Sequence, residues 1–288
     1  MSKYRHTAAT LATRRGSILE RAFRWIKRPK EERNKLLLND IKRVSRAIRM
    51  ISALPFYFGK AHFFNTFLAY HPDSHTTFNS HPEFSALFEN FVSKNKLNNA
   101  GDTARLWSFI LNTKQILSEG IEGDFAELGV WRGNTASVLA YYAANSNRNV
   151  ILFDTYEGFD KKDISGIDAN KSMSFEDTSL ELVKKVIGEN SCCCEFVKGY
   201  FPETINESHK KRQYAIVSLD CDLYEPMRAG LNFFYPLMPR GAILFLHDYS
   251  SLHWDGSKKA IDEFCRENGE YVTLIPDKSG SAFVRKTN

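Results

Sequence analysis

From residue 123 onward, the apolar positions of the chain switch between two spacings. Short apolar runs typical of buried strands lie at about 124–130, 149–156, 195–201, 214–220 and 241–249. Between these runs, apolar residues recur every three or four positions, which predicts helices at about 134–145, 175–188, 202–210, 225–236 and 257–267. Strands that alternate with helices in this way predict a parallel sheet with helices on both faces.

The C-terminal end departs from this rhythm. The segments 271–276 and 281–286 flank Asp277-Lys278-Ser279-Gly280, a turn-rich tetrapeptide, and this pattern indicates a hairpin. A terminal hairpin adds one antiparallel strand to the sheet. We therefore predict an α/β fold with a doubly wound, mostly parallel, seven-stranded sheet that contains one antiparallel strand.

Residues 1–95 have a different character, and we predict that they form a mostly helical N-terminal extension or lid, followed by a second domain at 96–288. Helical spacing occurs at 17–28, 33–50 and 82–96, and an aromatic-rich stretch lies at 56–70. Core packing is the favoured role for these aromatic residues. The alternatives are the lining of a sugar or polyketide pocket and a dimer interface, and we expect a homo-oligomer.

Charge is concentrated at the start of the chain. Residues 1–50 contain 15 Lys and Arg against 4 Asp and Glu, whereas the remainder contains 24 against 30. The segment 18–28 combines apolar positions at helical spacing with basic positions between them, as in helices that lie on anionic membranes. A solvated or subunit-packing helix is the slightly favoured alternative, and a mitochondrial transit peptide is a weaker one. Nucleic-acid binding is disfavoured because no reading motif accompanies the basic run.

Cysteine usage and hydropathy suggest a cytoplasmic protein. The five cysteines, three of them consecutive at 192–194, have neither the spacing of a disulfide framework nor that of a zinc site. We find no apolar run of the roughly 18 residues that a membrane span requires, and no secretory signal pattern. Peripheral contact with the inner face of a membrane through residues 1–30 stays an open alternative.

The segment 123–136 is the first candidate for ligand binding. A short strand carries Glu127 near its end, and the turn that follows has the pattern Glu-x-Gly-x-x-x-Gly, with Gly129 and Gly133 as its glycines. This turn is looser than the Gly-x-Gly-x-x-Gly of dinucleotide binders. It suits a nucleoside ligand without a pyrophosphate, such as S-adenosylmethionine (SAM).

Acidic residues end the later strands. Ligands of an open parallel sheet bind beyond the carboxyl ends of its strands. Asp154 at the second strand end is placed to bond ribose hydroxyls, while Asp220, Asp222, His247 and Asp248 follow the fourth and fifth strands. Such a group suits Mg²⁺ or another divalent cation, which would lower the pKa of a substrate hydroxyl. The alternatives are metal-free general-base catalysis by His247, and aspartates that merely cap the following helices.

These motifs, in order, resemble the macrocin/mycinamicin O-methyltransferase family. The resemblance rests on Gly-Asp-Phe-Ala-Glu-Leu-Gly-Val-Trp-Arg-Gly-Asn-Thr at 123–135, Phe-Asp-Thr-Tyr-Glu-Gly-Phe at 153–159, Gly-Tyr-Phe-Pro-Glu-Thr at 199–204, Leu-Asp-Cys-Asp-Leu-Tyr-Glu at 219–225 and Asp-Tyr at 248–249. It covers about 95–287. It implies a class I methyltransferase fold, Rossmann-like with a terminal hairpin, and a metal-dependent transfer of the SAM methyl group to a sugar hydroxyl of a glycosylated product.

The resemblance also implies roles for individual residues. Asp220 matches the family's metal-binding aspartate, but His247 stands where the family commonly has the first aspartate of Asp-Asp-Tyr, which puts the metal in question. We expect Asp220 and His247 to be catalytic, and Asp220, His247 and Asp248 to hold the metal. The expected cofactor contacts are Glu127, Gly129, Trp131, Arg132, Gly133, Asn134, Thr135, Asp154 and Tyr156.

The sequence thus predicts a SAM-dependent O-methyltransferase that acts on a sugar hydroxyl of a glycan or glycosylated metabolite. The aromatic N-terminal stretch and the segment with His253 and Trp254 are candidates for a substrate lid, an ordinary surface loop being equally compatible with the latter. The alternative functions are a catechol or phenolic O-methyltransferase and a non-catalytic SAM-binding scaffold.

Overall fold

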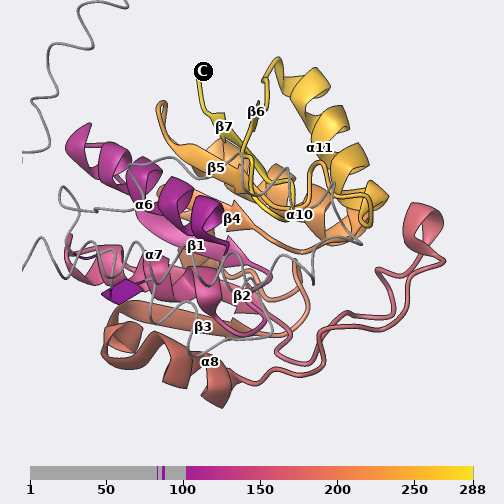
Figure 1. The fold of residues 1–288 in the computed structure, drawn as a ribbon, viewed down its shortest axis with the longest axis horizontal. Coiled ribbons are helices and arrows are strands. Elements are labelled where there is room, and N and C mark those ends of the chain that lie inside the picture. The colour runs from indigo at the N-terminus through magenta and orange to yellow at the C-terminus, as the bar shows by residue number, and fades with distance from the viewer. Residues whose placement is uncertain (1–82, 84–85, 88–101, 288) are drawn as a thin grey trace, which may run out of the picture. The chain divides into compact units, whose positions relative to one another are not determined.

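A computed structural model of the protein describes residues 83, 86–87 and 102–287 (Figure 1). The helices are α6 (Thr103–Ser118), α7 (Asn134–Ala144), α8 (Leu180–Ile187), α9 (Glu207–Lys210), α10 (Tyr224–Leu237) and α11 (Asp255–Asn268), with 3-10 helices η3 (Gly166–Asp168) and η4 (Gly188–Cys193). The strands are β1 (Asp124–Leu128), β2 (Val150–Asp154), β3 (Cys194–Lys198), β4 (Tyr214–Leu219), β5 (Ile243–Leu246), β6 (Thr273–Leu274) and β7 (Ala282–Arg285).

The strands form one seven-stranded sheet in the order β3-β2-β1-β4-β5-β7-β6. Strands β1 to β5 pair in parallel, and β7 runs antiparallel to both β5 and β6. The predicted fold class, including the terminal hairpin and the single antiparallel strand, is confirmed. The strand order reverses between β1 and β4, and the crevice outside the carboxyl ends at such a reversal is where ligands bind.

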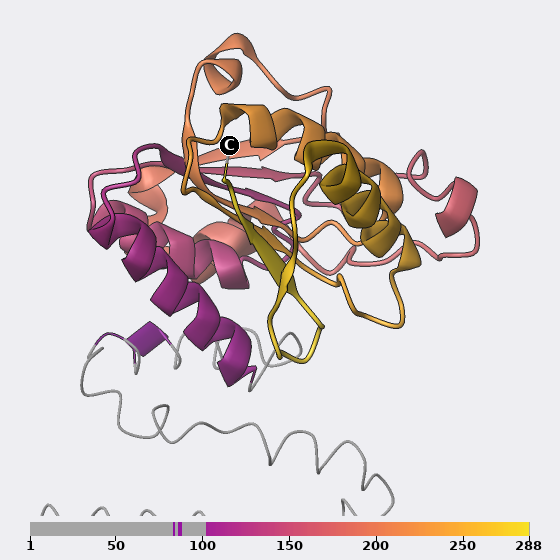
Figure 2. The same cartoon turned by 90° about the horizontal axis from the view of Figure 1, so that it is seen from above.

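Two layers of helices cover the sheet (Figure 2), because successive strand side chains point to opposite faces. On β2, Val150 and Leu152 join the buried cluster formed with residues of α6 and α7. Ile151 and Phe153, which alternate with them, join the cluster formed with residues of α10 and α11. Burial on both faces explains why the central strands are continuous apolar runs in the sequence.

Some elements are shorter than predicted, and their caps explain why. The helix expected at 175–188 begins only at Leu180, where the Ser179 hydroxyl accepts a hydrogen bond from the Leu182 amide. The helix expected at 202–210 is reduced to α9, because the Asn206 side chain caps it. The strand expected at 241–249 is limited to β5, so the residues after Leu246 are free to form a turn.

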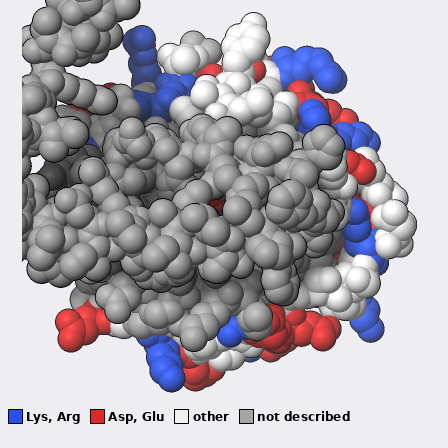
Figure 3. Space-filling model, viewed as in Figure 1, with Lys and Arg blue, Asp and Glu red and all other residues white. Residues whose placement is uncertain are grey.

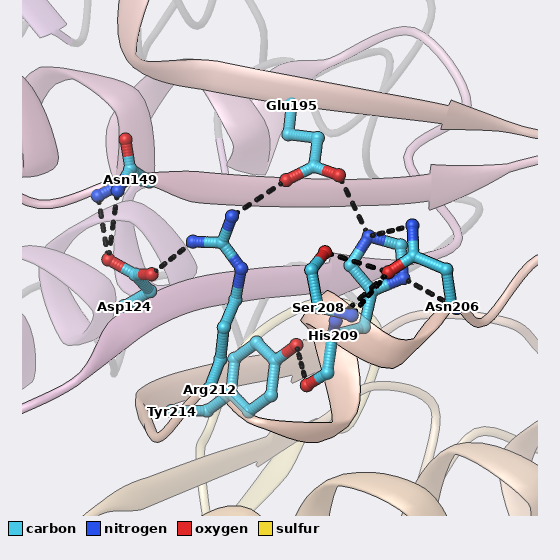
Figure 4. A network of polar contacts seen from close by, with 8 residues as sticks. All are labelled: Asp124, Asn149, Glu195, Asn206, Ser208, His209, Arg212 and Tyr214. Carbon is cyan, nitrogen blue, oxygen red and sulfur yellow. Dashed lines mark hydrogen bonds and ion pairs between the residues drawn. The ribbon is translucent and has the colours of Figure 1, made fainter.

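A polar network ties the amino ends of the strands together (Figure 4). Arg212, just before β4, bonds Asp124 of β1 at 2.6 Å and Glu195 of β3 at 3.0 Å. The other oxygen of Glu195 lies 2.8 Å from Nε2 of the fully buried His209. This network therefore fixes strand positions at the edge opposite the predicted ligand site.

Most of the predicted N-terminal extension lies outside the described residues. This applies to the basic arm, to the aromatic stretch at 56–70, to the domain boundary at 95/96 and to most of the helix predicted at 82–96. Within the described part, the Glu83 carboxylate accepts from Lys114 at 2.7 Å and from the Tyr142 hydroxyl at 3.0 Å.

The described surface carries both signs of charge. On the face seen in Figure 3, Lys and Arg side chains are interspersed with Asp and Glu around the visible rim. A helix with the length and apolar character needed to span a membrane does not occur among the described residues.

Candidate functional site

The carboxyl ends of the central strands bring the predicted site residues to one side of the sheet. Glu127, Asp154, Asp220 and His247 occupy positions that continue the side-chain alternation of Phe125, Leu152, Ile216 and Phe245, respectively, all in the α6/α7 cluster. Strand periodicity alone therefore places these four polar side chains on the same face, under α6 and the start of α7.

Asp154 organises the turn between β1 and α7. One of its carboxylate oxygens accepts hydrogen bonds from the backbone amides of Val130 at 2.6 Å and Trp131 at 2.9 Å. The other accepts from the Tyr156 amide at 2.5 Å. Burial raises the pKa of Asp154, and these three amides act against that rise. The carboxylate thus fixes the turn and keeps lone pairs for a ligand hydroxyl.

Glu127 is a buried acid with an incomplete set of partners. It is 1% exposed and lines the central cavity. Its Oε1 is 3.5 Å from the Ser218 hydroxyl, while its Oε2 is buried without a hydrogen-bond partner among the described residues. Burial, and then the charge of Asp220, raise the pKa of Glu127 well above its usual value. A cationic ligand group at this position would satisfy the free oxygen and relieve the desolvation.

The two glycines of the turn are required by chain packing. A Cβ on Gly129, whose φ is +85°, would lie 2.1 Å from the carbonyl oxygen of Asp220. Gly133 has a φ of +82° and is the N-cap of α7, where a Cβ would lie 3.1 Å from Val183. Because β1 and β4 approach this closely, Gly129 brings the turn between β1 and α7 next to Asp220.

Asp220, Asp222, His247 and Asp248 form a compact cluster beyond β4 and β5. One potential ligand atom from each lies within 4.8 Å of all the others. Leu223 and Trp254, rather than the aspartates, are the N-cap residues of α10 and α11. The alternative that Asp222 and Asp248 merely cap these helices is therefore wrong.

Arg105 of α6 is a member of this cluster that the sequence reasoning missed. Its guanidinium is fully buried and bonds Asp220 Oδ2 at 2.7 Å, Thr135 Oγ1 at 3.2 Å and His247 Nε2 at 2.6 Å. Arg105 and His247 hold the pKa of the Asp220 carboxyl far below its usual range, although burial acts in the opposite direction. Arg105 thus joins the start of α7 to the acid cluster.

His247 receives opposing influences. Its Nδ1 lies 2.5 Å from Asp220 Oδ1 and also contacts Asp248 Oδ2. Burial and Arg105 lower the pKa of His247, but the two carboxylates outweigh them and raise it to about 10. The hydrogen bond from Arg105 favours the neutral imidazole, since Nε2 can accept from an arginine only when it carries no proton. The proton on His247 therefore depends on what neutralises the two carboxylates.

A cavity of about 410 Å³ connects the turn with the acid cluster. Of the predicted site residues it is lined by Glu127, Gly129, Trp131, Asn134, Thr135, Asp154, Asp220, His247 and Asp248. Three predicted cofactor contacts are not among its lining residues. Arg132 pairs with Asp177 at 2.8 Å, Gly133 caps α7, and Tyr156 is buried with its hydroxyl on the Leu152 carbonyl.

Other lining residues did not emerge from the sequence reasoning as site residues. They include the acids Asp160 and Asp163 and the rings Phe159 and Phe175 on the segment between β2 and α8. Trp254, predicted as part of a lid, also lines the cavity, whereas its neighbour His253 is exposed. Burial raises the pKa of Asp163 to about 6, although the Tyr200 hydroxyl donates to it at 2.7 Å.

Known proteins resemble this chain in sequence. A model of the macrocin O-methyltransferase (TylF) family matches residues 99–283. A Streptomyces olivaceus protein, 8-demethyl-8-(2,3-dimethoxy-alpha-L-rhamnosyl)-tetracenomycin-C 4'-O-methyltransferase, is 26% identical over 161 residues, which are 52% of this chain and 60% of that protein. Mycinamicin III 3''-O-methyltransferase of Micromonospora griseorubida is 27% identical over 168 residues, 53% of this chain and 64% of that protein. The chain thus spans less than two thirds of the length of these relatives.

Solved structures confirm the fold. The O-methyltransferase NovP superposes with a TM-score of 0.60 at 17% identity, covering 73% of this chain and all of that one. The calicheamicin methyltransferase CalS11 superposes with a TM-score of 0.52 at 20% identity, covering 75% of this chain and 97% of that one.

Proposed function

The chain belongs to the macrocin O-methyltransferase (TylF) family, whose model matches residues 99–283, and from this premise we propose that it transfers the methyl group of SAM to a hydroxyl of a sugar in a glycan or glycosylated metabolite. The cavity at the carboxyl ends of the strands carries the proposal. On one side it contains Glu127, a buried acid with an unpartnered oxygen, and the β1–α7 turn that Asp154 fixes. On the other side it contains a cluster of acids that can accept a proton from a hydroxyl group.

SAM suits the donor half of this cavity. The molecule carries an ammonium group, a sulfonium and ribose hydroxyls, and it has no phosphate. Glu127 offers a buried carboxylate oxygen without a partner, which a cationic group would satisfy. Asp154 has acceptor capacity left after its three backbone bonds. We assign Glu127 and Asp154 to cofactor binding, together with the residues of the turn that line the cavity, which include Gly129, Trp131, Asn134 and Thr135.

The acceptor class follows from the family. The names of two relatives describe O-methylation of a tetracenomycin C derivative and of mycinamicin III, and the first of these names specifies a rhamnosyl substituent. Methyl transfer from a sulfonium is an in-line displacement, so the protein must chiefly align the acceptor oxygen with the methyl group. The cavity's acidic residues supply acceptors for the several hydroxyls of a sugar.

A divalent cation suits the acid cluster in its donor chemistry. Three carboxylates and one imidazole each bring a potential ligand atom within 4.8 Å of the other three, and oxygen-rich sets of this kind hold Mg²⁺ or Mn²⁺. Both oxygens of Asp220 already contact Arg105 or His247, so Asp222 and Asp248 would contribute most of the free ligand capacity. When bound, the cation would lower the pKa of the acceptor hydroxyl. We assign this site to Asp220, Asp222, His247 and Asp248; because Nε2 of His247 already contacts Arg105, this residue would bind the ion through Nδ1 after losing the proton there.

Labelled transfer tests the function directly. Purified protein is incubated with methyl-labelled SAM and a glycan and glycolipid extract of the source cells, and labelled products are identified. We expect label in an O-methyl group on a sugar, formed at a rate at least about a hundredfold lower when Asp220 is replaced by asparagine. Label confined to phenolic products would assign a catechol-type reaction instead. SAM binding without transfer to any fraction would favour a non-catalytic scaffold.

We also propose that residues 1–30 bring the enzyme to an anionic membrane surface that carries its acceptor. Their basic and amphipathic pattern supports this, although they lie outside the described residues. The full chain is expected to co-sediment with phosphatidylserine-containing vesicles at low salt and to be released by 0.5 M salt, roughly where the Debye length falls to a few ångströms. A chain lacking residues 1–30 that binds equally well would rule the proposal out.

A further inference from the structure

Three aromatic rings and a tryptophan of the cofactor turn form a continuous apolar wall in the cavity. Phe159 and Phe175 come from the segment 155–179, between β2 and α8, and Trp254 comes from the segment between β5 and α11. Phe159 packs edge-on against Trp254, with ring centres 5.7 Å apart, and against Phe175 at 5.1 Å. Phe175 in turn packs against Trp131 at 4.9 Å.

The wall has two ends with different neighbours. Trp131 belongs to the turn that Asp154 fixes, so this end adjoins the donor half of the cavity. Trp254 is the N-cap of α11, and the Ser257 hydroxyl in the first turn of that helix donates to the His247 carbonyl at 3.3 Å, so the opposite end adjoins the acid cluster. The acceptor oxygen must lie between the methyl donor and the group that takes its proton. The acceptor ring therefore belongs at the Phe159–Trp254 end of the wall.

A buried carboxylate holds the segment 155–179 in place across the cavity. Asp168 is fully buried, and its Oδ2 accepts a hydrogen bond from the Tyr224 amide at the start of α10, at 2.8 Å. The same carboxylate lies against the first turn of α11, where a Cβ on Gly256 would be 2.0 Å from Oδ2. A carboxylate at two helix N-termini is favoured electrostatically. It links the segment that carries Phe159 to the helices that follow Asp222 and Trp254.

We propose that Phe159 and Trp254 form the binding subsite for the acceptor sugar, packing against the apolar C–H face of a pyranose ring, with Asp168 as the positioning residue that keeps Phe159 there. Asp160 and Asp163 line the same cavity and offer carboxylates to the ring's hydroxyls. Apolar rings combined with a few directed acceptors match a saturated ring that carries hydroxyls at its edge. This inference rests on the proposed sugar O-methyltransferase function and names the subsite for its acceptor.

Ligand-observed NMR on protein loaded with S-adenosylhomocysteine tests the subsite. The probes are the methyl pyranosides of rhamnose, fucose, glucose, galactose and mannose, and calorimetry first measures S-adenosylhomocysteine affinity. We expect saturation transfer to the ring C–H protons of at least one pyranoside. Its affinity should fall about fivefold or more in Trp254→Ala and be largely retained in Trp254→Phe. Asp168→Asn should weaken pyranoside binding in the same direction.

The control is Leu252→Ala, two residues before Trp254 at a side chain that is 93% exposed, and it should bind the pyranoside like the wild type. Unchanged pyranoside affinity in Trp254→Ala would overturn the proposal, as would the absence of binding by every pyranoside. A loss of S-adenosylhomocysteine affinity in Trp254→Ala would also overturn it, by assigning the ring to the cofactor. A wild-type protein that fails to bind S-adenosylhomocysteine would instead contradict the proposed function itself.

Discussion

Replacing Asp220 with asparagine is expected to lower kcat about 10²- to 10³-fold while the affinity for SAM stays within about twofold. Asp220 contacts Arg105 through one oxygen and His247 through the other, so it is the residue that connects the cluster. An amide there removes a negative charge and turns an N–H donor toward either Arg105 or the imidazole. The measurement is initial-rate kinetics with the acceptor identified by labelled transfer, beside calorimetry with SAM.

Removing a bound metal ion is expected to lower turnover as the Asp220 substitution does. Wild-type enzyme treated with EDTA should lose turnover and regain it with Mg²⁺ or Mn²⁺, because the four clustered side chains supply the donor set for such an ion. Full activity in EDTA would overturn the metal proposal and favour metal-free catalysis by His247, which must first lose the proton that Asp220 and Asp248 hold on it. Asp255→Asn, at an exposed residue outside the cavity lining, is the matched control and should keep wild-type rates.

The fold could be predicted because the sequence repeats one simple signal. Each central strand is an apolar run buried on both faces, and each run is followed by a helical period, so the order of elements in the catalytic region is visible without a structure. The ends of elements were less predictable. The helix expected from residue 175 starts at Leu180, because a serine cap competes with the helical spacing of Phe175, which instead joins the cavity wall.

Site residues that lie at the ends of strands could be predicted from the sequence, whereas site residues on other segments were harder to predict. Glu127, Asp154, Asp220 and His247 could be found because strand periodicity and the carboxyl-end rule select them. Arg105 was missed because α6 was not predicted. The signal existed, since Asp102 caps a helix whose buried positions Leu106, Phe109, Ile110 and Thr113 are spaced by three, one and three residues. That Arg105 turns toward Asp220 depends on the packing of α6 against the sheet.

The segment 155–179 could not be placed from the sequence. It has no strand and only one short 3-10 helix, so no hydrophobic period gives its path. Its course is set by single contacts far apart in the chain, such as Asp168 with the Tyr224 amide and Trp131 Nε1 with Asp177 at 2.8 Å. The sequence therefore does not indicate that Phe159 and Phe175 line the cavity, because only the folded path of the segment brings them there.

Glu127→Gln is expected to weaken SAM binding about tenfold to a hundredfold, because it replaces an ionic hydrogen bond to a cationic ligand group by a neutral one. Burial raises the pKa of Glu127 in the ligand-free protein, and a cation binds the ionised form. Protons therefore compete with the ligand, so wild-type affinity should increase as pH rises through that raised pKa. In Glu127→Gln this part of the pH dependence should disappear. Calorimetric titration with SAM across pH measures both effects.

Asp154→Asn should weaken SAM binding to a similar degree for a different reason. Its carboxylate accepts from the amides of Val130, Trp131 and Tyr156, and an amide side chain offers only one oxygen for them. The turn would loosen, and the loss should have no link to the ionisation of Glu127. Glu122→Gln, at an exposed glutamate just before β1, is the control and should bind like the wild type at every pH. Wild-type affinity in both Glu127→Gln and Asp154→Asn would remove the cofactor assignment, since these two carboxylates are what connects the β1 turn to a SAM-like ligand.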